Sequence, residues 1–307
     1  TVGIPTPRSV MADDLVSALT GLDQFGLPVV IKADGPAGGK GAVIAPKREE
    51  AETALTAMLE HGALGASGKR VVIEEYVKGA EYTIYAVTDT EHTRLLPPVR
   101  VYKQLLNGAA GPSTPGMGAV VSPKPLDSTT MAAIERGIIQ PALDNLASRR
   151  SRFQGVLGAE IVITSHGPVV LEFNARFSDP DAQAILPLLD IDLAELFLAA
   201  ATGSLVDAPA ITTPWESSVA IVLASGGYPG PAKFGLPIAG VDRVSEGARL
   251  FQGAARLGEN GQFLTSGGRV LTVVGCDLNP ELARSRAYAA ADAISFDGVQ
   301  FRRDIGR

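Results

Sequence analysis

Apolar residues follow two different spacings along this chain, and each change of spacing marks the boundary of a predicted element. In segment 13–25 apolar side chains recur every three or four residues, as in an amphipathic helix, and two aspartates at its start form a helix N-terminal signal. Segment 27–62 begins with an apolar run of strand length, followed by a glycine-rich stretch, a second apolar run and a second helical spacing. This order predicts a strand, a loop, a strand and a helix.

Two further β-rich runs lie on either side of the tripeptide 165–167, Ser-His-Gly. Such runs joined by a short glycine-containing loop predict a β-hairpin, and a three-residue loop with glycine in its last, left-handed position is a known closure. Closed in this way, the hairpin places Glu160 directly opposite Glu172. Asn174 lies two residues beyond Glu172, so the two side chains share one face of the strand.

Two carboxylates and an amide on one strand face predict a metal site. Directly opposed side chains have Cβ atoms about 5 Å apart, and like charges placed so are destabilising unless a cation joins them. Hard oxygen ligands favour Mg²⁺ (or Mn²⁺), usually shared with phosphate oxygens. The alternative is a pair of salt-bridged glutamates on a solvated face, but apolar neighbours on both strands make that face hard to solvate. We therefore predict that Glu160, Glu172 and Asn174 bind the metal.

The sequence around this hairpin resembles a known family. GAEIVI (158–163) and LEFNARFSDPDAQ (171–183) resemble the end of an ATP-grasp domain, and most of all that of the phosphoribosylamine–glycine ligase (GAR synthetase) family. The resemblance implies that Glu172 and Asn174 bind magnesium. That family usually carries a small residue where this chain has Glu160, whereas many other ATP-grasp enzymes carry a metal-binding glutamate there. Glu160 is thus either a ligand typical of the wider superfamily or a coincidence, and the hairpin register favours a ligand.

The residues that follow the hairpin extend the resemblance. In the superfamily the arginine at the position of Arg176 faces the phosphates or the acyl phosphate, which implies a catalytic role. Asp179 is implied in substrate binding. An equally good explanation for Asp179 is that it caps the helix predicted from Pro180.

The glycine-rich stretch 34–41 contains four glycines and Lys40. Such a loop lets backbone N–H groups approach phosphate oxygens, and a lysine adds a point charge. It lacks the GKS or GKT ending of a Walker A loop, and a strand follows it instead of a helix. It resembles the ATP-grasp lid, which implies nucleotide contacts from Lys32, Gly38, Gly39, Lys40 and Gly41, with Lys40 also catalytic. A snorkelling strand lysine and a plain turn are the alternatives.

Segment 71–88 has two β-rich runs around an acidic turn. It matches the ATP-grasp hinge pattern EE(Y/F)(L/V)xGxE, which implies contacts with adenine and ribose from Glu74, Glu75, Tyr76, Val77 and Glu81. Adenine needs one backbone donor and one acceptor on an apolar shelf, which Tyr76 and Val77 would supply. The alternative is an exposed acidic turn.

Segment 97–122 is rich in glycine and proline, and loops of this length are usually functional or disordered. It resembles the substrate loop of the family, which implies substrate contacts from Lys103, Gly116, Met117 and Gly118. Charged residues of the family are replaced, however: Asp-His-Lys-Arg has become Val-Tyr-Lys-Gln at 101–104, and an acidic run has become uncharged. Such changes seldom leave specificity unaltered.

The remaining elements complete the domain prediction. Spacing predicts a helix over 126–148, kinked before Pro141, and another over 192–204 that ends at Gly203. The ending SFDGVQFRRDIGR resembles the C-terminus of the family. Its arginines Arg302 and Arg303, with Arg269, either reach a sugar phosphate or form a solvated rim. The fold class is mixed α/β, an ATP-grasp fold, with a lid subdomain at 1–76, a core subdomain at 77–208 and a small β-rich C-terminal domain at 209–307.

Composition narrows the class of protein further. The net charge of −6 and pI of about 5.2 argue against nucleic-acid binding. No apolar run reaches transmembrane length, there is no signal-like start, and the single cysteine favours a reducing cytoplasm. The opening GIPTP resembles the point where the ATP-grasp region begins in the family, after an N-terminal domain, so the chain is either a fragment or a form that works without that domain.

These observations predict an ATP- and Mg²⁺-dependent ligase that joins a small-molecule carboxylate to an amine through an acyl phosphate. Family chemistry would use glycine and 5-phosphoribosylamine. The altered loop leaves a different amino acid or amine open. A nucleotide-binding module without ligase activity is a further alternative.

Overall fold

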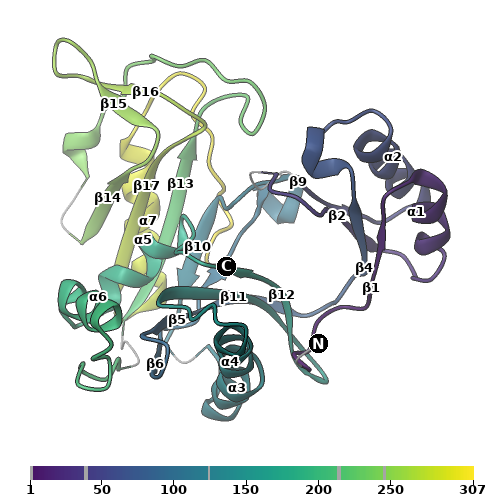
Figure 1. Ribbon diagram of the computed structural model, residues 1–307. Coiled ribbons are helices and arrows are strands. Elements are labelled where there is room, and N and C mark those ends of the chain that lie inside the picture. The colour runs from purple at the N-terminus through teal and green to yellow at the C-terminus, as the bar shows by residue number, and fades with distance from the viewer. Residues whose placement is uncertain (1–2, 38–40, 124, 213–215, 245–246) are drawn as a thin grey trace. The chain divides into compact units, whose positions relative to one another are not determined.

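A computed structural model describes residues 3–37, 41–123, 125–212, 216–244 and 247–307 (Figure 1). They form two compact units. Unit 1 contains Glu81–Ile161 and Glu172–Arg307, and unit 2 contains Pro5–Ala80 and Val162–Leu171. Among the described residues, no helix combines the length and apolarity needed to cross a membrane.

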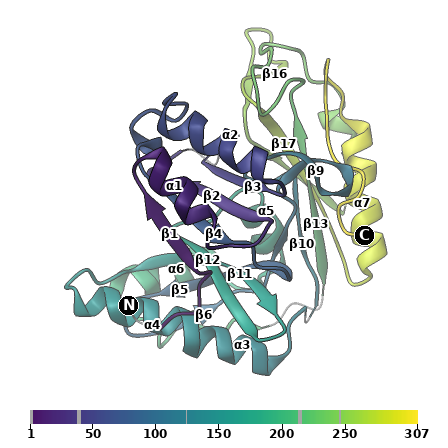
Figure 2. The same ribbon diagram turned by 90° about the vertical axis from the view of Figure 1, so that its right-hand side faces the viewer.

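Unit 2 is built on a four-stranded antiparallel sheet with the strand order β1-β4-β2-β3. The alternate residues Val29 and Ile31 point to one face, where they are fully buried with Leu55 of α2. Figure 2 shows α1 and α2 beside this sheet, where apolar periodicity predicted both helices. The bounds are β1 Ser9–Ala12, α1 Leu15–Leu22, β2 Val29–Ala33, β3 Ala42–Ala45, α2 Arg48–Leu59, the 3₁₀ turn Gly65–Gly68, and β4 Val71–Glu75.

Unit 1 contains a five-stranded sheet with the order β14-β17-β13-β10-β7, covered by α7 (Figure 1). Helix and sheet approach closely at Gly275, where an added Cβ would lie 2.2 Å from the carbonyl oxygen of Ala283. The sheet joins strands from both sides of the predicted domain boundary at residue 209. The bounds are β7 Arg100–Val101, β10 Gly118–Val121, β13 Ser217–Ala224, β14 Ala248–Gln252, β17 Arg269–Asp277 and α7 Pro280–Ala293.

A second sheet, of order β12-β11-β5-β6, carries the predicted hairpin, whose tip (162–171) belongs to unit 2. Two small ribbons and four helices complete the described part of the fold. The bounds are β5 Ala80–Thr88, β6 Thr93–Leu95, β8 Gln104–Leu106, β9 Ala110–Ser113, α3 Ser128–Ile134, α4 Gln140–Ser148, β11 Gly155–Thr164, β12 Gly167–Asn174, α5 Asp181–Ile185, α6 Leu193–Thr202, β15 Ala255–Leu257 and β16 Phe263–Thr265, with 3₁₀ turns at Asn107–Ala109, Leu186–Leu188 and Val241–Arg243.

The long helix predicted over 126–148 is interrupted before Pro141, as expected, but by a π-helical turn at Glu135–Ile139. There the N–H of Gln140 bonds to the carbonyl of Glu135, five residues earlier. The wider turn leaves room for the proline ring, which has no N–H to donate. The second predicted helix is α6, which Asp192 caps and Gly203 ends with a φ of 78°.

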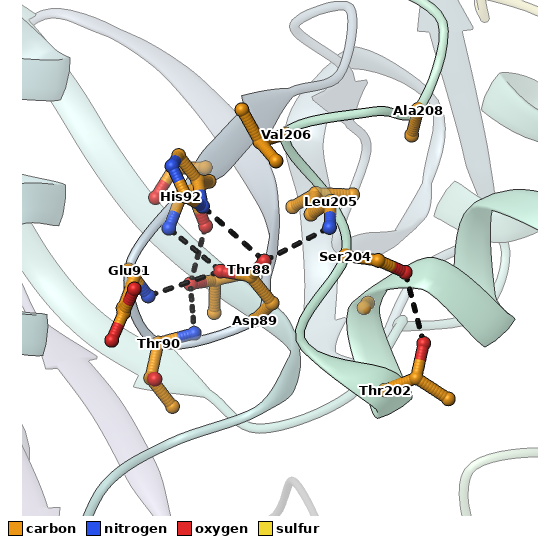
Figure 3. Close-up of polar contacts among 12 residues, drawn as sticks. Thr88, Asp89, Thr90, Glu91, His92, Thr202, Ser204, Leu205, Val206 and Ala208 are labelled. Carbon is orange, nitrogen blue, oxygen red and sulfur yellow. Dashed lines mark hydrogen bonds and ion pairs between the residues drawn. The ribbon is translucent and has the colours of Figure 1, made fainter.

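Asp89 connects the β5–β6 turn to the segment after α6 (Figure 3). Its side chain is buried and accepts from the N–H groups of Glu91 (3.0 Å), His92 (2.7 Å) and Leu205 (2.9 Å). Arg94 adds a hydrogen bond of 3.0 Å to the carbonyl of Leu205. These contacts join parts of unit 1 that lie more than a hundred residues apart in sequence.

Candidate active site

Glu160, Glu172 and Asn174 lie together in unit 1, at the end of the hairpin away from its tip. The amide nitrogen of Asn174 is 3.4 Å from an oxygen of Glu160 and 3.4 Å from an oxygen of Glu172. This contact confirms that the three side chains share one face. The predicted three-residue loop is wrong in length: β11 ends at Thr164 and β12 begins at Gly167, so two residues join the strands, and Gly167 has a positive φ of 112° at the start of β12.

Lys103 contributes a positive charge to this group. Its ammonium forms an ion pair with Glu160, and only 29% of the Lys103 side chain and 13% of the Glu160 side chain are exposed. Burial raises the pKa of the Glu160 carboxyl, and the charge of Glu172 adds to this, while Lys103 opposes it. Burial would lower the pKa of Lys103, but the carboxylates of Glu160 and Glu172 outweigh it and raise that pKa. The site thus combines two carboxylates of the hairpin with one cation from the segment after β7.

The donor set fits a magnesium-type ion that keeps other oxygen ligands. Among the described residues, no three or more His, Cys, Asp or Glu side chains converge to hold a metal. Two carboxylates and an amide, which can rotate to present its oxygen, leave positions for phosphate or water oxygens. Mg²⁺ usually binds in this way, through one or two carboxylates and substrate phosphates.

The loop that bears Lys103 is held by backbone contacts. Thr114 donates to the carbonyl of Lys103 from its N–H (2.8 Å) and its hydroxyl (2.6 Å). Of the predicted substrate residues, Met117 is fully buried and Gly118 begins β10, so both build the sheet that supports the loop. Gly116 is in close contact with Pro180, since an added Cβ would lie 2.6 Å from its ring.

Asp179 and Arg176 lie on the turn after β12. Arg269 donates to the carbonyl (2.5 Å) and to the carboxylate (3.0 Å) of Asp179. Asp179 therefore does not cap α5, which begins without a side-chain cap. Among the residues that the structure describes, the exposed guanidinium of Arg176 bonds within its own turn, to the carbonyl of Phe177 and the hydroxyl of Ser178.

A buried pair that the sequence analysis missed supports this turn. The hydroxyl of Tyr85 donates to Asp181 (2.6 Å) and accepts from the N–H of Ser178 (3.0 Å). Burial, with the nearby charge of Asp181, raises the pKa of Tyr85 far above its usual range. Burial also raises the pKa of Asp181. A tyrosine inside the apolar run of β5 was the available signal.

In unit 2, three of the predicted nucleotide residues are already engaged. The ammonium of Lys32 lies 2.7 Å from the carboxylate of Glu74 and donates to the carbonyl of Leu171 (3.2 Å). Glu75 accepts from the N–H (3.0 Å) and the guanidinium (2.8 Å) of Arg8, and these two hydrogen bonds lower its pKa. Lys32 and Glu74 thus lie together on the sheet.

The other predicted nucleotide residues are exposed, half-buried or outside the described part of the chain. Tyr76 is 39% exposed, Val77 is half-buried, and Glu81, which belongs to unit 1, is exposed. The carbonyl of Gly41 accepts from the N–H of Ala33 (2.8 Å). Gly38, Gly39 and Lys40 lie outside the described residues. The nucleotide contacts of all these residues stay predictions.

The three arginines considered as sugar-phosphate ligands each pair with an aspartate of the chain. Arg269 pairs with Asp179, and the exposed Arg303 pairs with Asp292. Arg302 is only 3% exposed and pairs with Asp304, so it is not part of a solvated rim.

The fold and this site define an ATP-grasp enzyme. Residues 1–182 match the family described as phosphoribosylglycinamide synthetase, ATP-grasp (A) domain, and residues 218–307 match its C domain. The chain therefore belongs to the phosphoribosylglycinamide synthetase family of ATP-grasp ligases, as its motifs predicted.

Individual relatives agree with this assignment. The chain is 39% identical to a phosphoribosylamine–glycine ligase of Nostoc, over 99% of this chain and 72% of the relative. A ligase of the same name from Streptomyces coelicolor is also 39% identical, over 99% and 71%. The crystal structure of a phosphoribosylamine–glycine ligase from Thermotoga maritima has a TM-score of 0.86 at 30% identity, covering 99% of this chain and 75% of that one.

A more distant structure shares the fold alone. The biotin carboxylase domain of 2-oxoglutarate carboxylase from Hydrogenobacter thermophilus, in complex with MgADP, has a TM-score of 0.72 at 16% identity, over 98% of this chain and 64% of that one.

Proposed function

We propose that the chain catalyses ATP- and Mg²⁺-dependent joining of a carboxylate to an amine, with release of ADP and phosphate. The observation that carries the proposal is the convergence of Glu160, Glu172 and Asn174 in unit 1. These residues would hold a divalent ion (Mg²⁺ or Mn²⁺), which would supply charge neutralisation for phosphoryl transfer. Family membership supports the use of ATP.

The chain's own residues then take the following roles. The γ-phosphoryl group passes to a carboxylate oxygen, which leaves ADP and an acyl phosphate, and the amine attacks the acyl carbon and expels phosphate. The ammonium of Lys103, at the carboxylate pair, offsets negative charge on the acyl phosphate. The exposed guanidinium of Arg176 offers a second positive charge from the neighbouring turn. Lys32 and Lys40 remain proposed phosphate contacts.

The substrates proposed first are glycine and 5-phosphoribosylamine, because the relatives above are named for that reaction. The loss of charged residues from segment 101–110, which keeps Lys103, supports a different amino acid or amine as the alternative. Neither proposal involves nucleic acid or a membrane. We further propose a cytoplasmic location, as the single cysteine favours.

Calorimetry with Mg-ATP, followed by an ADP-release assay, tests the proposal. The acceptor panel contains glycine with freshly generated phosphoribosylamine, other amino acids and unphosphorylated amines. Glu172→Gln removes one proposed ligand charge and should abolish Mg²⁺-dependent turnover, whereas Glu195→Gln, on an exposed turn of α6, should leave it unchanged. ATP binding without acceptor-dependent ADP would identify a nucleotide-binding module instead.

A further inference from the structure

Arg302 is a buried cation far from Lys103 in sequence, yet it contacts both neighbours of that residue. Its side chain is only 3% exposed, and a buried charge is costly unless it is paired and hydrogen-bonded. Two of its nitrogens bond to the two oxygens of Asp304, at 2.8 and 2.7 Å. A third donates to the carbonyl of Gln104 at 3.0 Å, and the guanidinium carbon lies 5.2 Å from the centre of the Tyr102 ring.

Arg302 thus holds the backbone after Lys103, while before Lys103 it contacts the ring of Tyr102. The N–H of Tyr102 bonds to the carbonyl of Gly118 (2.9 Å), and the carbonyl of Lys103 accepts twice from Thr114. With Gln104 held by Arg302, backbone contacts fix the position of Lys103, and its side chain runs to Glu160. A lysine on a long flexible stem needs such a fixed base if its ammonium is to meet one carboxylate.

The C-terminal segment is itself tied to the same loop. Asp304 accepts from the N–H of Gly108 (2.7 Å), and the N–H of Arg303 donates to the side chain of Asn107 (2.8 Å). On the other side, the hydroxyl of Tyr288 on α7 donates to the carbonyl of Arg302 (3.2 Å). Asp304 therefore orients the guanidinium, and α7 anchors the segment that bears it.

Stability alone does not account for a charge in this place. A buried ion pair is often no more stabilising than apolar side chains of the same volume. A planar guanidinium, in contrast, bonds to carboxylate, carbonyl and ring in fixed directions. From this geometry we infer that Arg302 is a positioning residue, which holds the Gln104 backbone and the Tyr102 ring so that Lys103 reaches the carboxylate of Glu160. The inference rests on the proposed function, because a fixed position of Lys103 matters for catalysis only if its charge stabilises a transition state, which small displacements of a charged group weaken.

Competitive acetylation with acetic anhydride, read by mass spectrometry, measures the position of Lys103 directly. The exposed Lys233 serves as the internal reference. In Arg302→Met the reactivity of Lys103 should rise roughly threefold or more, as its ion pair opens for a larger share of the time. Arg302→Lys keeps the charge but not the planar fork, so it should also raise the reactivity.

A matched variant separates positioning from general loosening. Arg303→Met removes the neighbouring arginine, which is exposed and pairs with Asp292. It should leave Lys103 as unreactive as in the unmodified chain. Equal reactivity in Arg302→Met and the unmodified chain would overturn the inference, and so would a rise in Arg303→Met as large as that in Arg302→Met. The labelling needs no nucleotide or substrate, so a chain without ligase activity would refute only the proposed function.

Discussion

Replacing Tyr85 by phenylalanine should destabilise unit 1 through Asp181. Tyr85 is fully buried and Asp181 is 2% exposed. The hydroxyl donates to one oxygen of Asp181, and the other oxygen has no hydrogen-bond partner in the part of the chain that the structure describes. The phenylalanine ring keeps the packing against Phe177 but leaves the carboxyl without its donor and the N–H of Ser178 without its acceptor.

The expected size follows from these two lost partners. A buried polar group left unsatisfied costs about 1–3 kcal/mol, and an unpaired buried charge costs about 3–5 kcal/mol. The cost at Asp181 should be below that of an unpaired buried charge, because burial already raises the pKa of Asp181 and favours its neutral form. We therefore expect Tyr85→Phe to lower the free energy of unfolding by about 3 kcal/mol at neutral pH.

The raised pKa of Asp181 also sets the direction in which the effect of Tyr85→Phe changes with pH. The folded pKa of Asp181 is raised, so its favourable contribution is fully present below the unfolded pKa and is lost as pH rises through the folded pKa. Losing the hydrogen bond from Tyr85, which favours the ionised form, raises the folded pKa further. The penalty of Tyr85→Phe should therefore be smaller at acidic pH than at neutral pH.

Urea unfolding followed by tryptophan fluorescence and circular dichroism, at pH 7 and pH 5, measures both values. Tyr82→Phe is the control, because Tyr82 is half-buried on the same strand, three residues earlier and hence on its other face. Adding Asp181→Asn to Tyr85→Phe removes the carboxyl that has lost its hydrogen-bond donor and should recover part of the free energy of unfolding. A penalty below about 1 kcal/mol, or one equal at both pH values, would refute the reasoning.

Three other predictions address separate parts of unit 1. The guanidinium of Arg302 lowers the pKa of Asp304 from 3.8 to about 2, so about 2 kcal/mol of stability is present above pH 3.8 and lost as pH falls through 2. In urea unfolding between pH 6 and pH 3, the free energy of unfolding that Asp304→Asn loses should therefore shrink on acidification. A loss that stays constant over this range would contradict the prediction. Asp89→Asn keeps only one acceptor oxygen for three N–H groups, so it should lower the free energy of unfolding by about 2 kcal/mol and speed hydrogen exchange at the Leu205 N–H. Unchanged exchange at Leu205 would show that Asp89 does not hold this segment. Lys103→Met removes a cation that competes with a metal for Glu160, so the site should bind Mn²⁺ about tenfold more tightly. Electron paramagnetic resonance measures this affinity, and weaker binding would show that the lysine helps to build the site.

Much of the fold could be predicted because its signals are local. Apolar spacing located α1, α2 and α6, and a glycine with positive φ ends α6 as its residue type required. The shared face of Glu160, Glu172 and Asn174 followed from a short loop and the two-residue period of a strand. The interruption before Pro141 was expected, but its π-helical form was not, because a proline requires only that the helix lose one hydrogen bond.

The side-chain pairs of the site could not be predicted, since each joins segments far apart in sequence. Tyr85 and Asp181 are 96 residues apart, and Arg302 and Gln104 are 198 apart. Neither pair leaves a periodic signal, because one polar residue in an apolar run or one arginine in a tail has many possible partners. Where they meet depends on the packing of whole sheets, which composition and spacing do not encode residue by residue.

The pairing of Lys103 with Glu160 explains why two separate observations on the sequence belong together. Glu160 was notable as a carboxylate where the GAR synthetase family usually has a small residue, and segment 101–104 was notable for keeping only the lysine of its charged residues. In the fold these features are one ion pair, in which each charge compensates for the burial of the other. Removing either side chain alone would leave a buried charge without this partner, so the retained lysine and the added glutamate have to be interpreted together.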